Sequence, residues 1–185
     1  MTGSSYFTNP LEFLISTLFS LYILAVMLRF LLGAVRADFY NPISQFLVRI
    51  TNPLLVPLRK AIPSIGKFDS AAMLLMIILQ LAAVTLILLL RGDGISSAAL
   101  VIITLVTLVS LLIDVFMFAI IIEVIISWMN PGSYNPVNSL LHSLTSPLLR
   151  PIRRLIPPIA GIDLAPLFAI IGLQVLRMLI LPLLA

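Results

Sequence analysis

The stretch NPISQFLVRITNPLLVPLRKAIPSIGKFD, residues 41–69, decides the fold, because the chain repeats its construction as NPVNSLLHSLTSPLLRPIRRLIPPIAGID, residues 135–163. The two copies align without insertion or deletion, since 135 − 41 and 163 − 69 both equal 94. The matched positions are Asn41, Pro42, Thr51, Pro53, Pro57, Arg59, Pro63 and Asp69 in the first copy, and Asn135, Pro136, Thr145, Pro147, Pro151, Arg153, Pro157 and Asp163 in the second. The period exceeds the roughly 20 to 50 residues of short-repeat solenoids. The chain is therefore a duplication of one unit, consisting of an apolar segment, a basic proline-rich connector and a second apolar segment.

Composition indicates an integral membrane protein. Apolar residues make up 61% of the 185 residues and charged residues 10%, and the mean hydropathy is +1.21; a soluble domain has roughly 45 to 50% and 25%. A large soluble catalytic domain is excluded. The absence of cysteine excludes disulfides, thiolate metal sites and haem attachment through the chain's own thiols.

The apolar segments predict four transmembrane helices, at Leu11–Leu32, Ala71–Leu90, Ala98–Trp128 and Leu164–Leu184. We expect Pro182 to have little effect so late in the last one. Each connector is predicted to form two short amphipathic pieces lying in the interface, one starting at its Asn-Pro and the other at its Thr-x-Pro. The expected fold is an all-α membrane protein with two tandem repeats, residues 1–93 and 94–185.

The basic residues predict the orientation. They are Arg36, Arg49, Arg59, Lys60 and Lys67 in the first connector, Arg150, Arg153 and Arg154 in the second, and only Arg91 in the turn between the second and third apolar segments. Because positive charge marks the cytoplasmic side, both connectors should face the cytoplasm and both termini the outside. The two halves are then parallel repeats, related by an axis along the membrane normal.

The connector pattern NPxxxxLxxxTxPxLxPxRxxIP, present twice with an aspartate before the following apolar helix, resembles that of the YggT (YlmG) family of small bacterial membrane proteins. The resemblance covers nearly the whole chain. It implies a multi-pass protein of the bacterial inner membrane. Suggested roles of the family are in osmotic stress tolerance, cell division or nucleoid organisation, and chloroplast cytochrome assembly. It supplies no defined reaction and no catalytic residue to transfer.

Five basic residues are the candidate binding residues of the connectors: Arg59, Lys60, Arg150, Arg153 and Arg154. One interpretation is a topology signal that contacts anionic lipid headgroups; the alternative is a specific site for phosphate groups or a cytoplasmic partner. Lipid is the nearer partner for the net charge of +4, so direct nucleic-acid binding is not expected. We hypothesise that the two connectors pack together as one cytoplasmic platform.

Polar residues also occur within the predicted spans: Arg29, Gln80, Asp114, Glu123, Gln174 and Arg177. An aspartate at the centre of a span costs about 2.5 to 3.5 kcal/mol, so Asp114 should face protein or water, with Arg177 as the candidate neutralising partner. A structural ion pair is the simpler interpretation, and a proton or ion pathway is the alternative. Arg29 and Glu123 occupy equivalent positions, 123 − 29 being 94, and predict a salt bridge between the halves. The single histidine, His142, is expected to be an interfacial surface residue.

No nucleotide-binding, hydrolase or metalloprotease motif is present in the sequence, so no catalytic residue, cofactor or metal ligand is predicted. The leading hypothesis is a non-enzymatic scaffold or assembly protein. It would act through its connectors in division, envelope stress or complex assembly, with a membrane-protein partner or as a homo-oligomer. The alternative is a small ion or solute transporter, or a channel subunit, that acts as an oligomer.

Overall fold

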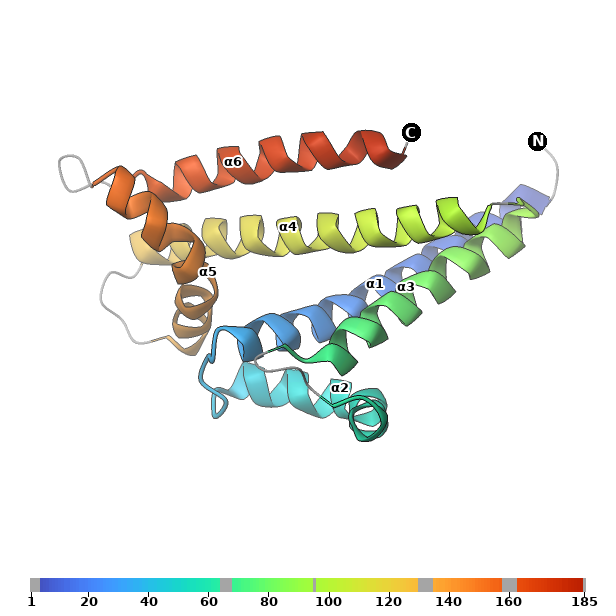
Figure 1. The fold of residues 1–185 in the computed structure, drawn as a ribbon, viewed down its shortest axis with the longest axis horizontal. Helices are drawn as coiled ribbons and strands as arrows, with labels where there is room; N and C mark the ends of the chain where they lie inside the picture. The colour runs from blue at the N-terminus through green and yellow to red at the C-terminus, as the bar shows by residue number, and fades with distance from the viewer. Residues whose placement is uncertain (1–3, 64–67, 95, 130–134, 158–162, 185) are drawn as a thin grey trace.

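The computed structural model describes residues 4–63, 68–94, 96–129, 135–157 and 163–184. The regular elements in these ranges are helices (Figure 1): α1 (Ser4–Ala34), α2 (Pro42–Ala61), α3 (Ser70–Arg91), α4 (Ser97–Met129), α5 (Pro136–Leu155), α6 (Ala165–Ile180) and the short 3-10 helix η1 (Leu181–Leu184). The prediction of an all-α protein is confirmed. Lys67, counted above among the basic residues of the first connector, lies outside the described residues.

Three helices, α1, α3 and α4, are long and apolar enough to cross a membrane. Helix α3 shows how its ends are fixed: the Asp69 carboxylate accepts a hydrogen bond from the Ala72 amide at the start, and Gly92 ends the helix with a φ of 72°. A left-handed residue at this position is favourable for glycine because it has no Cβ. Helices of sufficient length are therefore present at the three predicted places; α3 and α4 are each two residues longer than predicted, and α1 is nine residues longer, 31 against 22.

Helix α6 is shorter than the predicted fourth span. It has 16 residues and ends at Ile180, where the chain continues as η1. Pro182 explains the difference, because proline has no amide donor and its ring clashes with the carbonyl four residues earlier in an α-helix. The expectation that Pro182 has little effect was wrong, and α6 is a short apolar helix of about 24 Å at 1.5 Å per residue.

Each connector is one continuous helix rather than two short pieces. Asn41 and Asn135 cap α2 and α5 by accepting from the amides of Ile43 and Val137. The second predicted start, at Thr51, is wrong: α2 continues through Pro53 and Pro57, and its second half takes a new direction (Figure 1). Proline inside a helix is the usual cause of such a bend.

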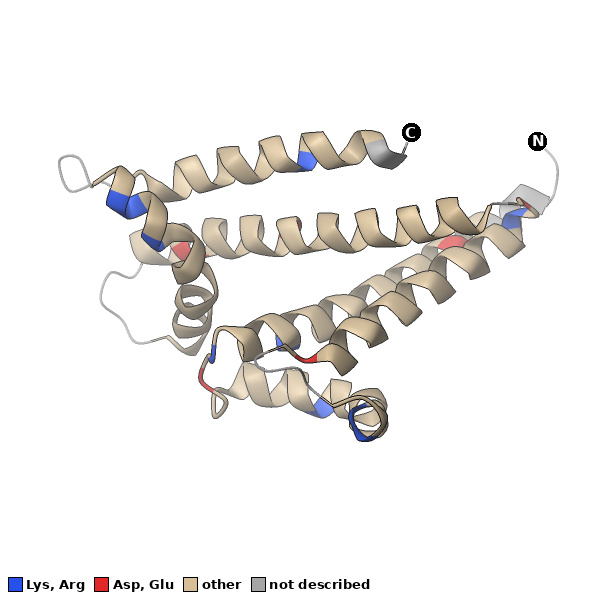
Figure 2. Ribbon diagram, viewed as in Figure 1, with Lys and Arg blue, Asp and Glu red and all other residues tan. Residues whose placement is uncertain are grey.

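The connectors lie at the same end of the long helices (Figure 1). Helices α1 and α3 pack side by side and run in opposite directions, and α1 also contacts α2; α4 makes the corresponding contacts with α6 and α5. The halves meet mainly where α3 packs on α4 and where α1 contacts α5, whereas α6 contacts only α4, α5 and η1 within the described residues. Figure 2 shows that the long helices are largely uncharged and that basic residues gather on the connectors.

Candidate functional site

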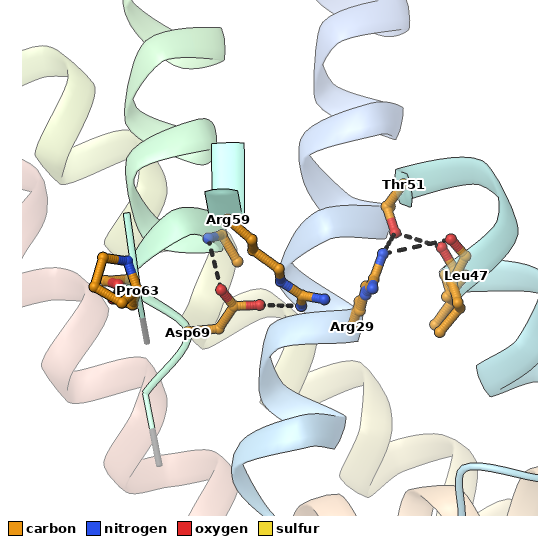
Figure 3. A network of polar contacts seen from close by, with 9 residues as sticks. Arg29, Leu47, Thr51, Arg59, Pro63 and Asp69 are labelled. Atoms are coloured by element: carbon orange, nitrogen blue, oxygen red, sulfur yellow. Dashed lines mark hydrogen bonds and ion pairs between the residues drawn. The ribbon is translucent and has the colours of Figure 1, made fainter. Parts of the chain in front are cut away.

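In the first repeat, polar side chains meet where α1 passes behind the bent connector (Figure 3). The hydroxyl of Thr51, which is fully buried, accepts a hydrogen bond of 2.6 Å from Arg29 Nη1 and donates one of 2.6 Å to the Leu47 carbonyl. Arg29 also reaches the Val48 carbonyl at 3.4 Å, and the Tyr22 hydroxyl donates to the Ile50 carbonyl at 3.2 Å. Donors on α1 thus bind backbone carbonyls near the prolines of α2, as neighbouring helices do at broken helices in membranes.

An ion pair joins the end of the same connector to the start of α3. Arg59 Nη2 donates to Asp69 Oδ2, while Asp69 Oδ1 caps α3. The Ser70 hydroxyl adds a bond of 2.6 Å to the Pro63 carbonyl. Asp69 therefore has two tasks, since one oxygen fixes the helix start and the other holds the connector.

Arg29 and the Arg59–Asp69 pair border one cavity of about 610 Å³. Its walls are partly apolar and include Phe30 and Phe68, whose rings stack with centroids 6.5 Å apart. Both arginines line it, and Figure 3 shows the Arg59 guanidinium beside Asp69 and the Arg29 guanidinium beside Thr51. We call this space the first cavity.

The second repeat builds the same arrangement with a different charge. Glu123 stands at the position of Arg29, and its Oε2 accepts from the hydroxyl of the fully buried Thr145. Its Oε1 lies 2.9 Å from His142 Nδ1, and His142 Nε2 lies 3.2 Å from the Ser146 hydroxyl. Arg153 Nε donates to Asp163 Oδ2 at 2.8 Å, and Asp163 Oδ1 accepts from the Ala165 amide. Glu123, Arg153 and Asp163 line a second cavity of about 600 Å³.

The predicted salt bridge between Arg29 and Glu123 is wrong. Each side chain binds the buried threonine of its own repeat, Thr51 or Thr145, and no ion pair joins the two within the described residues. The repeat offset predicted only that the two residues lie at the same level along their helices, whereas the direction in which each side chain points depends on the rotation of its helix. His142 is exposed, as predicted, but its contact with Glu123 was not foreseen.

The Asp114–Arg177 pair is present between α4 and α6, with Arg177 Nη1 2.7 Å from Asp114 Oδ1. The side chains are 28% and 33% exposed, so the pair is partly covered rather than sealed in the core. Gln80 and Gln174 make no side-chain hydrogen bond with described residues and do not join it. A second pair was missed: Arg91 binds Glu12 through two bonds of 3.1 and 2.8 Å, which ties the end of α3 to α1.

The candidate binding residues of the connectors divide into two groups. Arg59 and Arg153 are held by aspartates, whereas Lys60, Arg150 and Arg154 are exposed and form no ion pair with described residues. Their spacing held a signal that sequence reasoning did not use: the arginine and aspartate of each pair are 10 residues apart in both copies, since 69 − 59 and 163 − 153 are equal. No group of three metal-ligating side chains occurs among the described residues.

Comparison with known proteins bears on this geometry. The family model described as CCB3/YggT matches the chain twice, at residues 8–90 and 102–184. The chain belongs to the CCB3/YggT family. The two matches are offset by 94 residues, since 102 − 8 and 184 − 90 both equal 94, so the family model itself finds the duplication.

Relatives of the CCB3/YggT chain occur in several bacteria. It is similar to an uncharacterised protein of Pseudomonas aeruginosa, with 49% identity covering 91% of this chain and 86% of the relative. A Vibrio alginolyticus protein is 45% identical, covering 90% of both chains. The Escherichia coli K12 protein YggT is 39% identical, covering 92% of this chain and 88% of its own length. No solved structure matches the chain. The resemblance to YggT is confirmed, and the relatives carry no stated reaction.

Proposed function

We propose that this protein is a non-enzymatic scaffold of the bacterial inner membrane, with four spans and with both connectors on the cytoplasmic side. In this proposal α2 and α5 form one basic platform that binds anionic lipid headgroups and presents a docking surface to a membrane-protein partner or a second copy. A role in envelope or osmotic stress, division or complex assembly follows from the family resemblance.

One observation carries the proposal: the two connectors are joined to each other. The Asn41 side chain caps α2 through its oxygen and donates through Nδ2 to the Pro136 carbonyl at 2.8 Å. Beneath this bond, Leu47 of α2 and Leu140 of α5 belong to one buried cluster together with two residues of α1, Ala25 and Leu32. Segments 94 residues apart thus make one surface across the end of the bundle.

The charge on this surface supports contact with a membrane. Five cations of the connector regions are exposed and form no ion pair with described residues: Arg36, Arg49, Lys60, Arg150 and Arg154. Near an anionic leaflet each such charge contributes about 1 kcal/mol of attraction. Among the described cations of the connectors, carboxylates hold Arg59 and Arg153, so the five exposed ones are available to headgroups or to an acidic partner.

Crosslinking tests the joined platform. The chain has no cysteine, so Asn41→Cys with Pro136→Cys can be introduced directly and treated with a short bifunctional thiol reagent in native membranes. We expect an efficient intramolecular crosslink. The matched control pairs Asn41→Cys with Leu89→Cys on the exposed far end of α3, which should not crosslink. Equal crosslinking of both pairs, or of neither, would contradict the platform.

Charge neutralisation tests its lipid preference. The variant Arg49→Gln, Lys60→Gln, Arg150→Gln and Arg154→Gln should lose several-fold of its selectivity for phosphatidylglycerol over phosphatidylcholine, measured with spin-labelled lipids in nanodiscs. The control replaces the three arginines by lysine and retains the charge. Unchanged selectivity in the glutamine variant would sink the lipid part of the proposal, and a cytoplasmic signal from a C-terminal reporter fusion would sink the orientation.

A second candidate, a transporter or channel subunit acting as an oligomer, is favoured by the Asp114–Arg177 pair between two apolar helices. Intramembrane ionisable groups commonly mark ion or substrate pathways. Proteoliposome flux assays separate the two: Asp114→Asn should abolish any flux under the transport hypothesis. Under the scaffold hypothesis it leaves the connector crosslink and lipid selectivity intact.

A further inference from the structure

The first cavity has the size and the walls of a ligand site. Its volume of about 610 Å³ lies within the range of roughly 300 to 1,000 Å³ typical of small-molecule pockets. The lining combines the stacked rings of Phe30 and Phe68 with charged groups from α1, the end of α2 and the start of α3. A molecule with one charged group and an apolar portion matches this lining better than a purely polar or purely apolar one.

The charged groups that line the first cavity leave an excess of positive charge. Arg29 and Arg59 contribute two cations, and Asp69 contributes one anion, so the sum is +1. Asp69 binds Arg59, whereas Arg29 binds only a hydroxyl and a carbonyl, both through Nη1. The remaining donors of the Arg29 guanidinium have no partner among the described residues. Partial burial of a guanidinium that has no carboxylate partner is energetically unfavourable, because the charge loses hydration without gaining a counter-ion.

The second cavity provides an internal comparison. It occupies the equivalent place, has nearly the same volume of about 600 Å³, and is lined by Glu123, Arg153 and Asp163, with a sum of −1. Its carboxylates are already bonded, since Glu123 accepts from Thr145 and Asp163 pairs with Arg153. The same scaffold thus carries an excess of positive charge in one half only.

We propose that the first cavity binds a phosphate group, held between the guanidinium groups of Arg29 and Arg59. Arginine suits this ligand because its planar fork of donors matches two phosphate oxygens at once. The apolar wall made by Phe30 and Phe68 accommodates the carbon portion of a phospholipid next to its phosphate. The site is separate from the outward cations of the connectors, so it does not depend on the proposed platform.

Lipid titration by native mass spectrometry tests the site. Delipidated protein in detergent is titrated with phosphatidylglycerol, and in a second arm with inorganic phosphate. Arg29→Gln and Arg59→Gln should each weaken binding about tenfold, because each removes charge-assisted hydrogen bonds. The matched control is Arg153→Gln, the same substitution at the equivalent position of the second repeat, which should leave phosphate binding unchanged.

A gain of binding makes the test independent of folding defects. Asp69→Asn removes the carboxylate that competes for Arg59, while asparagine still supplies the oxygen that caps α3. It should tighten phosphate binding about three- to tenfold by the ordinary strength of a surface-accessible charge interaction. Asp163→Asn should produce no such gain, because Glu123 remains in the second cavity. If Arg29→Gln does not fold, Asp69→Asn decides alone, and no gain overturns the proposal.

The arms also separate the sources of the phosphate. Displacement of inorganic phosphate by phosphatidylglycerol identifies the lipid as occupant; binding of inorganic phosphate alone, with the same mutational pattern, keeps the phosphate site and assigns it to free phosphate. Equal losses in Arg153→Gln and Arg59→Gln would overturn the site. So would binding that survives Arg29→Gln and Arg59→Gln but is lost in the platform variant Arg49→Gln, Lys60→Gln, Arg150→Gln and Arg154→Gln.

Discussion

The two cavities share six repeat-equivalent lining positions, and at one of them the charge is reversed, with Arg29 in the first and Glu123 in the second. A buried threonine lies at the centre of each cluster, bound to a guanidinium in the first repeat and to a carboxylate in the second. A hydroxyl is both donor and acceptor, so Thr51 and Thr145 fit either neighbour without any change in the backbone. The comparison teaches that the duplicated frame preserves its caps, prolines and threonines, while the charge that faces the cavity is free to change sign.

Charge reversal gives the largest expected effect and tests whether the two clusters are independent. Arg29→Glu and Glu123→Arg should each destabilise the protein by about 3 kcal/mol, because each places a wrong charge in a partly buried site. Since the clusters do not contact each other through these residues, the losses in the double variant should add. Unfolding in detergent micelles measures the free energy of unfolding of each variant. If the double variant is more stable than either single variant, Arg29 and Glu123 interact after all, and the salt bridge that the structure lacks would have to be reconsidered.

The next effect concerns a pair that only the second repeat possesses. The repeat counterparts of Asp114 and Arg177 are Ser20 and Ala83, since 114 − 94 and 177 − 94 give 20 and 83. Asp114→Ser alone should cost about 2 kcal/mol, because it leaves Arg177 unpaired between apolar helices. Adding Arg177→Ala should return about 1 kcal/mol of that loss. An additive double variant would show that the pair has no mutual stabilisation.

Removal of the central hydroxyl is expected to have a smaller, matched effect in the two clusters. Thr51→Val and Thr145→Val should each lower the free energy of unfolding by about 1.5 kcal/mol, the usual value of a hydrogen bond to a charged group. The serine variants keep the hydroxyl and serve as controls. A large loss at one threonine and none at the other would show that the two clusters are not equivalent in stability.

The smallest expected effect is at the histidine that the first repeat lacks. His142→Val introduces the residue found at the equivalent position, Val48, and removes an exposed contact with Glu123. The cost should be below about 1 kcal/mol, as for a single exposed hydrogen bond. Thermal unfolding of this variant at low and high salt measures it, and a loss comparable to that of Thr145→Val would assign His142 a central role.

Much of this fold could be predicted from the sequence, because local chemistry decides it. The Asn-Pro starts of α2 and α5, the uncharged run of α3 and the 94-residue repeat follow from capping, hydropathy and direct alignment. The partners of Arg29 and Glu123 could not be predicted in this way, since they depend on helix rotation and on a bend within each connector. Thr-x-Pro looks like a helix start in the sequence, yet Thr51 lies inside α2 because α1 donors stabilise the carbonyls of the bend.

The Glu12–Arg91 pair has a consequence for the order in which the molecule is made. Together with Arg59–Asp69 it holds α3 at both ends, to α1 at the end of the helix and to α2 at its start, using only residues from the first 93. Once this portion of the chain has been synthesised, both arginines, Arg59 and Arg91, already have their carboxylate partners. In the second half Arg153–Asp163 involves only residues that precede α6, whereas Arg177–Asp114 needs Arg177 near the end of α6 and is therefore the last of the described ties to become available. All the described ion pairs of the first half can thus form before the last pair of the second half is complete.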